Sequence, residues 1–214
     1  MNTQGYFDIR FVSDRRRDRL WMTLCRHYFD RLIHRDFTVL ELGAGYGHFI
    51  NNVVCRKRIA IDAWDGFLRF LNEGVEGHIG DVTSLDFLED ASVDFVFASN
   101  LFEHMPQASF AHVLGTLRRK LRTGGTLNIL QPNYRFCYDE YFDDYTHVTV
   151  YSDRSICDFL RTHGFDVIQC EPRFLPLTVK SRLPVLPWLV RLYLSSPVKP
   201  LGKQMLIRAR PRTC

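Results

Sequence analysis

The amino-acid sequence predicts an α/β fold with a doubly wound, mostly parallel sheet. Short apolar runs that suit buried strands alternate with segments of helical periodicity over most of the chain. The 214 residues are 46% hydrophobic and 24% charged, an ordinary composition for one compact domain with a sizeable core. We therefore expect a single domain, with ligands bound at the carboxyl ends of its strands.

The chain opens with a predicted amphipathic helix over residues 14–34. Its apolar side chains fall on one stripe, and Asp14 can cap the first turn. We interpret the Arg15-Arg16-Arg17 run as solvated surface. The stripe consists of Leu20, Trp21, Leu24, Tyr28 and Leu32.

The N-terminal residues and the cysteines bear on the compartment. The first 19 residues are polar and charged and do not form a secretory signal. The six cysteines are scattered without a C-x-x-C pair, which argues against a zinc site and a disulfide framework. We expect a cytoplasmic protein.

A glycine-rich loop follows the first predicted strand, residues 38–42. Glycines stand at 43, 45 and 47, directly after an apolar run that contains Glu41. Glycine accepts positive φ and lets a ligand approach the main chain closely. The dinucleotide pattern G-x-G-x-x-G has another spacing, which disfavours a nicotinamide oxidoreductase. We expect a helix over residues 46–55.

The next two predicted strands also end near acids. Residues 58–62 end at Asp62, which is placed to accept hydrogen bonds from ribose hydroxyls; the alternative is a helix N-cap. Trp64 can pack on an adenine. His78-Ile79 closes a third strand before Asp81, which could instead be a turn residue.

A buried fourth strand is predicted over residues 93–98, and it leads into the loop 99–105. Pro106 suits the first position of a helix whose apolar period continues to Leu121, where Gly124-Gly125 is expected to stop it. Residues 126–131 form the fifth predicted strand.

These signals follow the order of the class I S-adenosylmethionine-dependent methyltransferases, which residues 38–131 resemble. The resemblance implies a Rossmann-like methyltransferase fold of seven strands with an antiparallel last strand, and S-adenosylmethionine as cofactor. It implies that Asp81 receives the amine of adenine and that residues 99–105 lie beside the methionine portion. The implied cofactor-binding residues are Glu41, Gly43, Ala44, Gly45, Gly47, Asp62, Ala63, Trp64, Asp81, Val82, Asn100 and Leu101.

The same resemblance divides the expected single domain 1–214. Residues 1–37 form a helical cover, 38–131 the cofactor-binding half, and 132–214 the acceptor side. The acceptor side contains a helix capped by Ser152 and ended by Gly164, and strands 165–170 and 204–209. A basic amphipathic insertion, 173–203, lies between these last strands.

The segment 134–151 is the predicted acceptor site. It holds seven aromatic residues, of which Tyr134, Tyr138 and Tyr145 are expected to contact the substrate unless they only pack. An oxygen acceptor needs a base, and histidine has a suitable pKa of about 6.5. His147 and His104 are the candidates.

Each histidine also has a structural interpretation. His104 could orient its loop or cap the helix that follows, and His147 could pair with Asp143 or Asp144. Some quinone-pathway relatives carry a Glu-His pair similar to Glu103-His104, but no third ligand stands at a known spacing, so no metal is expected.

The C-terminal segment is strongly basic. Residues 173–214 carry nine Lys or Arg and no acid, which leaves −5 on the rest of a chain of net charge +4. Lys180 and Arg182 are expected to bind an anionic acceptor. The alternatives are packing on the same domain, a homodimer contact, or peripheral contact with an anionic membrane surface. The apolar run is too short to span a membrane.

A narrower resemblance concerns the acceptor. The sequences YFDDYTH and RFLPLTVKSRLP are similar to those of methyltransferases of bacterial surface-polysaccharide and glycolipid assembly. This implies O-methylation of a sugar hydroxyl, a glycan or a glycolipid at the inner face of the membrane. The alternatives are a small-molecule methyltransferase acting on a phenol, quinone precursor or amine, and a catalytically silent cofactor-binding subunit. A nucleic-acid partner is not expected, because the Asn/Asp-Pro-Pro-Tyr loop and the Pro-Cys pair are absent.

Overall fold

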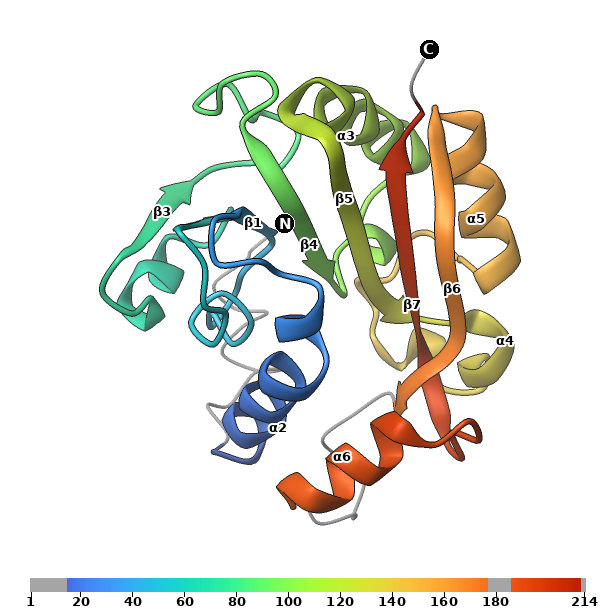
Figure 1. Cartoon of the computed structure of the whole chain (residues 1–214). Coiled ribbons are helices and arrows are strands. Elements are labelled where there is room, and N and C mark those ends of the chain that lie inside the picture. Colours follow the sequence, from blue (N-terminus) through green and yellow to red (C-terminus); the bar gives the residue numbers. More distant parts are fainter. Residues whose placement is uncertain (1–14, 177–185, 213–214) are drawn as a thin grey trace. The chain divides into compact units, whose positions relative to one another are not determined.

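The computed structural model describes residues 15–176 and 186–212, and its strands form one seven-stranded sheet in the order β3-β2-β1-β4-β5-β7-β6 (Figure 1). β7 runs antiparallel to both of its neighbours, β5 and β6, whereas β1, β2 and β3 pair in parallel, as do β4 and β5. This confirms the predicted mixed sheet. The strands are β1 Thr38–Leu42, β2 Lys57–Asp62, β3 Val75–Ile79, β4 Val93–Ser99, β5 Leu121–Pro132, β6 Phe165–Pro176 and β7 Gly202–Pro211.

The chain divides into two compact units. The first unit comprises Met1–Val82 and Arg182–Ser196, and the second comprises Thr83–Ser181 and Pro197–Cys214. The predicted functional division at residues 37/38 and 131/132 stays a prediction. Predicted residues Asp14, Lys180 and Arg182 lie outside the described residues.

The first unit is built on β1, β2 and β3 and on two helices, α2 (Arg15–His27) and α6 (Pro187–Ser195), which pack on each other. All five residues of β1 are buried. In the core of this unit, the rings of Phe29 and Phe49 pack edge-on with their centroids 5.2 Å apart. The N-terminal helix is shorter than predicted, because it ends at His27 and a short 3₁₀ turn follows it.

The predicted helix over residues 46–55 is wrong. Residues 45–52 form turns, with only one helical backbone bond, from Asn51 N to Gly47 O at 3.0 Å. Two features prevent a helix. The glycines at 45 and 47 have positive φ, and the Ile50 N–H donates to the carboxylate of Glu41 at 2.9 Å rather than to a preceding carbonyl.

The second unit contains β4, β5, β7 and β6 with the helices α3 (Gln107–Lys120) and α5 (Asp153–Thr162). Its core stacks aromatic rings: Phe110 lies 3.8 Å from Phe102 and 5.1 Å from Phe159 between centroids. As predicted, Ser152 caps α5, with its side chain accepting from Ser155 N, and Gly164 follows the helix with φ +83°.

Gly124-Gly125 does not end α3, contrary to the prediction. The helix stops at Lys120 because the N–H groups of Ala91 and Ser92 donate to the carbonyls of Arg119 and Lys120. β5 starts at the next residue, and the glycines lie in a break of its register with β4, where Gly124 has φ +83°. Pro106 precedes α3 as its N-cap rather than forming its first residue.

β6 continues to Pro176, so residues 173–176 belong to the sheet and not to the insertion. Within the described residues, the longest apolar helical stretches fall short of what a membrane span requires.

Candidate functional site

The glycine loop between β1 and β2 has a backbone that ordinary residues rarely adopt. Gly43, Gly45 and Gly47 have φ of 66°, 52° and 65°. A side chain at Gly47 would meet Asn51 Nδ2 at 2.9 Å, so the loop has no room for one there. The N–H groups of Gly43 and Ala44 both donate to Ile61 O on the neighbouring strand. The loop is therefore fixed to the carboxyl end of β2.

Asp62 joins this loop to the one after β2. Its carboxylate accepts from Gly45 N and from Trp64 N, each at 2.8 Å. The side chain is buried, and burial raises its pKa although the backbone bonds oppose this. The observed bonds make Asp62 the cap of a turn. The ribose contact stays a prediction, in which the ribose would share the carboxylate with these backbone donors.

Glu41 lies under the loop rather than on its surface. It is buried in β1, and its Oε2 accepts from Ile50 N at 2.9 Å. Burial raises the pKa of its carboxyl well above the usual range. Its observed contacts hold the glycine loop in place.

An aromatic group flanks the loop. Trp64 is buried, and its ring lies 5.4 Å from that of Tyr46 and 5.8 Å from that of Phe70. Among the other predicted residues after β2 and β3, Val82 is buried, whereas Ala63 and Asp81 are exposed. Tyr46 and Phe70 were not predicted, and only the position of Tyr46 inside the glycine loop offered a signal.

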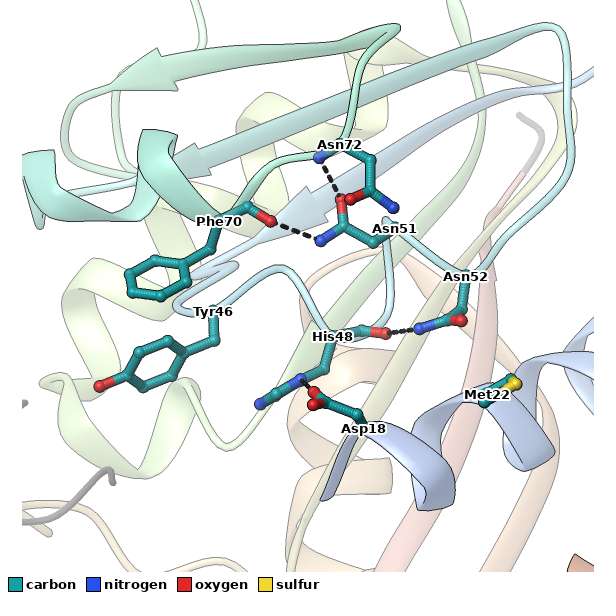
Figure 2. A pocket seen from close by; sticks show the side chains of 8 residues that line it. All are labelled: Asp18, Met22, Tyr46, His48, Asn51, Asn52, Phe70 and Asn72. Carbon is teal, nitrogen blue, oxygen red and sulfur yellow. Dashed lines mark hydrogen bonds and ion pairs between the residues drawn. The ribbon is translucent and has the colours of Figure 1, made fainter. Parts of the chain in front are cut away.

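A polar pocket of about 270 Å³ lies beside this loop (Figure 2). Its polar side chains bond to one another or to the backbone: His48 pairs with Asp18 of α2 at 2.9 Å, and Asn51 donates to the backbone carbonyl of Phe70 at 2.7 Å. Its volume is near the lower limit for small-molecule sites, about 300 Å³. The lining residues are Asp18, Met22, Tyr46, His48, Asn51, Asn52, Phe70 and Asn72.

These observations fit S-adenosylmethionine. The main chain of the loop is open to close approach, an acid stands at the tip of β2, and a tryptophan next to it can pack on a base. Gly43, Ala44, Gly45, Asp62 and Trp64 would hold the cofactor.

In the second unit, the loop after β4 makes a sharp turn. Asn100 has φ +49°, uncommon for a non-glycine residue, and is held by two bonds: its N–H donates to Leu130 O, and its Oδ1 accepts from Gln204 Nε2, each at 2.8 Å. Leu101 beside it is half-buried. The 3₁₀ turn Phe102–His104 follows.

This turn carries a cluster of Glu103, His104 and His147. One ligand-type atom from each lies within 4.8 Å of the others, and the two imidazole centroids are 4.8 Å apart. Backbone hydrogen bonds join the two segments that carry these residues, since Val148 N and Thr149 N both donate to Glu103 O. The cluster thus contains both predicted histidines, which are 43 residues apart in the sequence.

Hydrogen bonds determine which nitrogen of each histidine carries the proton. His147 Nδ1 lies 2.6 Å from the Tyr141 carbonyl oxygen, which can only accept, so Nδ1 is the donor. His104 Nδ1 donates to Thr146 Oγ1 at 2.9 Å, because that hydroxyl gives its own proton to Asp144 at 2.6 Å. In both histidines the lone pair is therefore on Nε2.

Burial dominates the electrostatics of the cluster. It raises the pKa of Glu103 to about 8 and lowers the pKa of His104 to about 4, in the latter case with the help of His147. Glu103 is fully buried, and neither of its carboxylate oxygens has a hydrogen-bond partner among the described residues. Sequence reasoning named this residue only as part of a Glu-His pair; its place in the apolar run Leu101-Phe102 was the available signal of burial.

The predicted substrate-contacting tyrosines differ in exposure. Tyr134 is half-buried, with its ring 5.2 Å from that of Tyr141, whereas Tyr138 and Tyr145 are 67% and 75% exposed. The last two are available to a ligand.

Comparisons with known proteins identify the family. A family model described as a methyltransferase domain matches residues 13–170. Phosphoethanolamine N-methyltransferase 1 of Triticum aestivum is 34% identical over 103 residues, which cover 43% of this chain and only 20% of that protein.

Solved structures show the same fold. An S-adenosylmethionine-dependent methyltransferase of Archaeoglobus fulgidus has a TM-score of 0.70 at 19% identity, with 97% of this chain and 99% of that chain covered. A chain from the complex of the Haloferax volcanii Trm112 methyltransferase activator with a methyltransferase has a TM-score of 0.68 at 17% identity, covering 92% and 91%. The chain belongs to the class I S-adenosylmethionine-dependent methyltransferases.

Proposed function

We propose that this methyltransferase acts on a hydroxyl group. The observation that supports it is the cluster of Glu103, His104 and His147. In this cluster the Nδ1–H of His147 donates to the Tyr141 carbonyl, so the ring is held in place and its lone pair is on Nε2. The cofactor supplies a methyl group activated by a positively charged sulfur. An alcohol is a poor nucleophile until it loses its proton, so a group that takes up or displaces that proton is needed for an oxygen acceptor.

The acceptor class that we propose first is a sugar hydroxyl on a glycan, a glycolipid or their precursors. Exposed aromatic rings in the segment that carries His147 support it, since such rings offer apolar faces to a ligand: Tyr138, Phe142 and Tyr145. The positive charge of residues 173–214 supports an acceptor that carries phosphate, in solution or at a membrane surface.

A second candidate is methylation of an amine. The partial similarity to the wheat phosphoethanolamine N-methyltransferase favours it. An unprotonated amine already has a nucleophilic lone pair and needs less help from a base. A silent cofactor-binding subunit is the third candidate, and it predicts binding without turnover.

The acceptor can be identified with cofactor that carries a labelled methyl group. The purified chain would be offered nucleotide sugars, lipid-linked glycans, phenols and phosphoethanolamine, and methylated products located by mass spectrometry. We expect an O-methyl sugar. Turnover of phosphoethanolamine alone would replace our proposal by the second candidate, and cofactor binding without any turnover would favour the third.

Lys180 and Arg182 test the anionic part of the proposal. Alanine at both positions should raise KM for a phosphate-bearing acceptor at unchanged cofactor affinity, because lysine and arginine bind phosphate through charge and paired hydrogen bonds. It should also reduce the dependence of turnover on salt. An unchanged KM and salt dependence would show that these two cations do not bind the acceptor.

A further inference from the structure

The most unusual polar group in the described part of the chain is Glu103. Its side chain is fully buried, and neither carboxylate oxygen has a hydrogen-bond partner among the described residues. Buried polar groups almost always have a partner, and an exception points to a water, an ion or a functional role. An oxygen of this carboxylate lies within 4.8 Å of a ring nitrogen of both His104 and His147.

The two histidines are arranged as metal ligands usually are. A metal-binding imidazole typically donates its other N–H to a carbonyl or to a polar group that is itself hydrogen-bonded. His147 donates Nδ1–H to the Tyr141 carbonyl, and His104 donates to Thr146, whose hydroxyl is bonded to Asp144. These bonds fix the plane of each ring and place its lone pair on Nε2, the nitrogen that would serve as ligand.

We propose that Glu103, His104 and His147 bind one divalent transition-metal ion, of which Zn²⁺ is the best match, with a further position open to the acceptor hydroxyl. Two imidazoles and one carboxylate form a known ligand set for catalytic zinc with an open position. Magnesium and calcium prefer oxygen ligands, so two nitrogens disfavour them. Donors on tetrahedral zinc are roughly 3.3 Å apart, so the widest pair would close by about 1.5 Å on binding.

This inference deepens the proposed hydroxyl acceptor and rests on it for its chemistry. A hydroxyl oxygen bound to the ion is more acidic than in water, so its O–H bond breaks and the proton passes to solvent. The resulting oxygen nucleophile forms its bond to the methyl carbon while the carbon–sulfur bond breaks, and both electrons of that bond stay on sulfur. No oxidant or reductant is needed. The ion would thus replace His147 as the group that activates the acceptor.

Metal binding is tested without any acceptor. The untagged full chain would be treated with a chelator, dialysed and titrated with Zn²⁺ by calorimetry, and separately with Co²⁺, whose visible absorption reports its coordination geometry. We expect one ion per chain, a Co²⁺ spectrum of four- or five-coordination, and an upward shift of the melting temperature with Zn²⁺.

The variants Glu103→Gln, His147→Ala and Thr146→Val separate the cluster from surface binding. The first two remove a ligand and should abolish stoichiometric binding. Thr146→Val removes the hydroxyl that links His104 to Asp144 and should weaken affinity about 10–100-fold. The matched control is His163→Ala: His163 also bonds Nδ1 to a carbonyl, that of Phe159, but lies at the end of α5 outside the cluster. It should bind Zn²⁺ like the wild type.

Two outcomes would overturn the inference. One is a wild-type chain that takes up no stoichiometric Zn²⁺ and gives a Co²⁺ spectrum of the free aqueous ion, a result independent of whether any variant folds. The other is equal binding by wild type, Glu103→Gln and His147→Ala, which would assign the ion to the surface. If the metal-free chain still methylates a hydroxyl and depends on His147, the proposed function stands and a base mechanism replaces the ion.

Discussion

Glu41 and Glu103 are both buried glutamates near the carboxyl end of a strand, and burial raises the pKa of both. They differ in their partners. Glu41 accepts a backbone N–H, that of Ile50, whereas Glu103 has no partner among the described residues. The same residue type in the same kind of place therefore has two different environments.

The difference follows from what each acid stabilises. The hydrogen bond from Ile50 N offsets part of the free-energy cost of burying Glu41. It also holds the glycine loop in a non-helical conformation, in which the glycines have positive φ. The cost of burying Glu103 is not offset within the described chain. We propose that a bound metal ion supplies the missing interactions, since two histidines lie beside this carboxylate.

The largest effect is expected from His147→Ala. Removal of this imidazole should lower the rate of methyl transfer to a hydroxyl roughly a hundred-fold or more, whether it acts as base or as ligand. Single-turnover measurement of the rate, with cofactor affinity from calorimetry, checks this; we expect the affinity to be unchanged. His163→Ala is the control, and a full rate in His147→Ala would remove the cluster from the mechanism.

Asp62→Ala tests the glycine loop, the region that Glu41 supports. Loss of its carboxylate leaves the N–H groups of Gly45 and Trp64 without their acceptor and removes the proposed ribose contact, so S-adenosylmethionine binding should weaken by about 1–3 kcal/mol. Calorimetry measures this, and the melting temperature without cofactor separates the structural part. Unchanged affinity together with a lower melting temperature would restrict Asp62 to holding the loop.

Glu41→Gln tests stability against pH. In the folded state the raised pKa keeps Glu41 protonated to a higher pH than in the unfolded state, where it ionises above about pH 4.5. The unfolded state then binds fewer protons, so the free energy of unfolding of the wild type falls as pH rises, by up to about 1.4 kcal/mol per pH unit, until the folded pKa is passed. Glutamine lacks this contribution.

Urea unfolding of both proteins from pH 4.5 to 8 checks this prediction. The free energy of unfolding of the wild type, relative to that of Glu41→Gln, should be greatest at pH 4.5 and should fall as the pH rises. Parallel pH profiles would show that Glu41 titrates alike in both states.

Gln131→Met should have the smallest effect. It tests whether a buried polar side chain without a partner, which has no proposed function, only lowers stability, in contrast to Glu103. Gln131 is fully buried in β5, and its side-chain amide has no partner among the described residues. Replacing it with an apolar side chain of similar length should raise the free energy of unfolding by about 1 kcal/mol. Asn128→Leu is the contrast, because Asn128 donates to Val96 O and accepts from Arg208 Nε, and its loss should destabilise. Lower stability of Gln131→Met would show that the amide is satisfied in solution.

Local patterns made most of the fold predictable. All seven strands were recognised, although β5 begins five residues before its predicted start and β6 ends six residues after its predicted end. The helix between Ser152 and Gly164 was recognised too, because burial and capping act through neighbouring residues. The predictions failed where a distant group decided the backbone. The carboxylate of Glu41 ended the helical path after the glycine loop, and the turn at Ala91-Ser92 before β4 ended α3 before Gly124.

The sequence by itself determined the cofactor loop, since three glycines that accept positive φ directly follow a strand, and Asp62 stands 21 residues after Glu41. Only the tertiary structure decided the surroundings of Glu103. The sequence shows the Glu103-His104 pair but not that His147 joins it, nor that the carboxylate is buried without a hydrogen-bond partner from another described residue. Those facts arise when the segment 138–150 folds back over the turn after β4 and bonds to it, through Thr149 Oγ1 to Met105 O and His104 Nδ1 to Thr146. Contacts between residues more than 40 positions apart depend on chain closure, which no local pattern encodes.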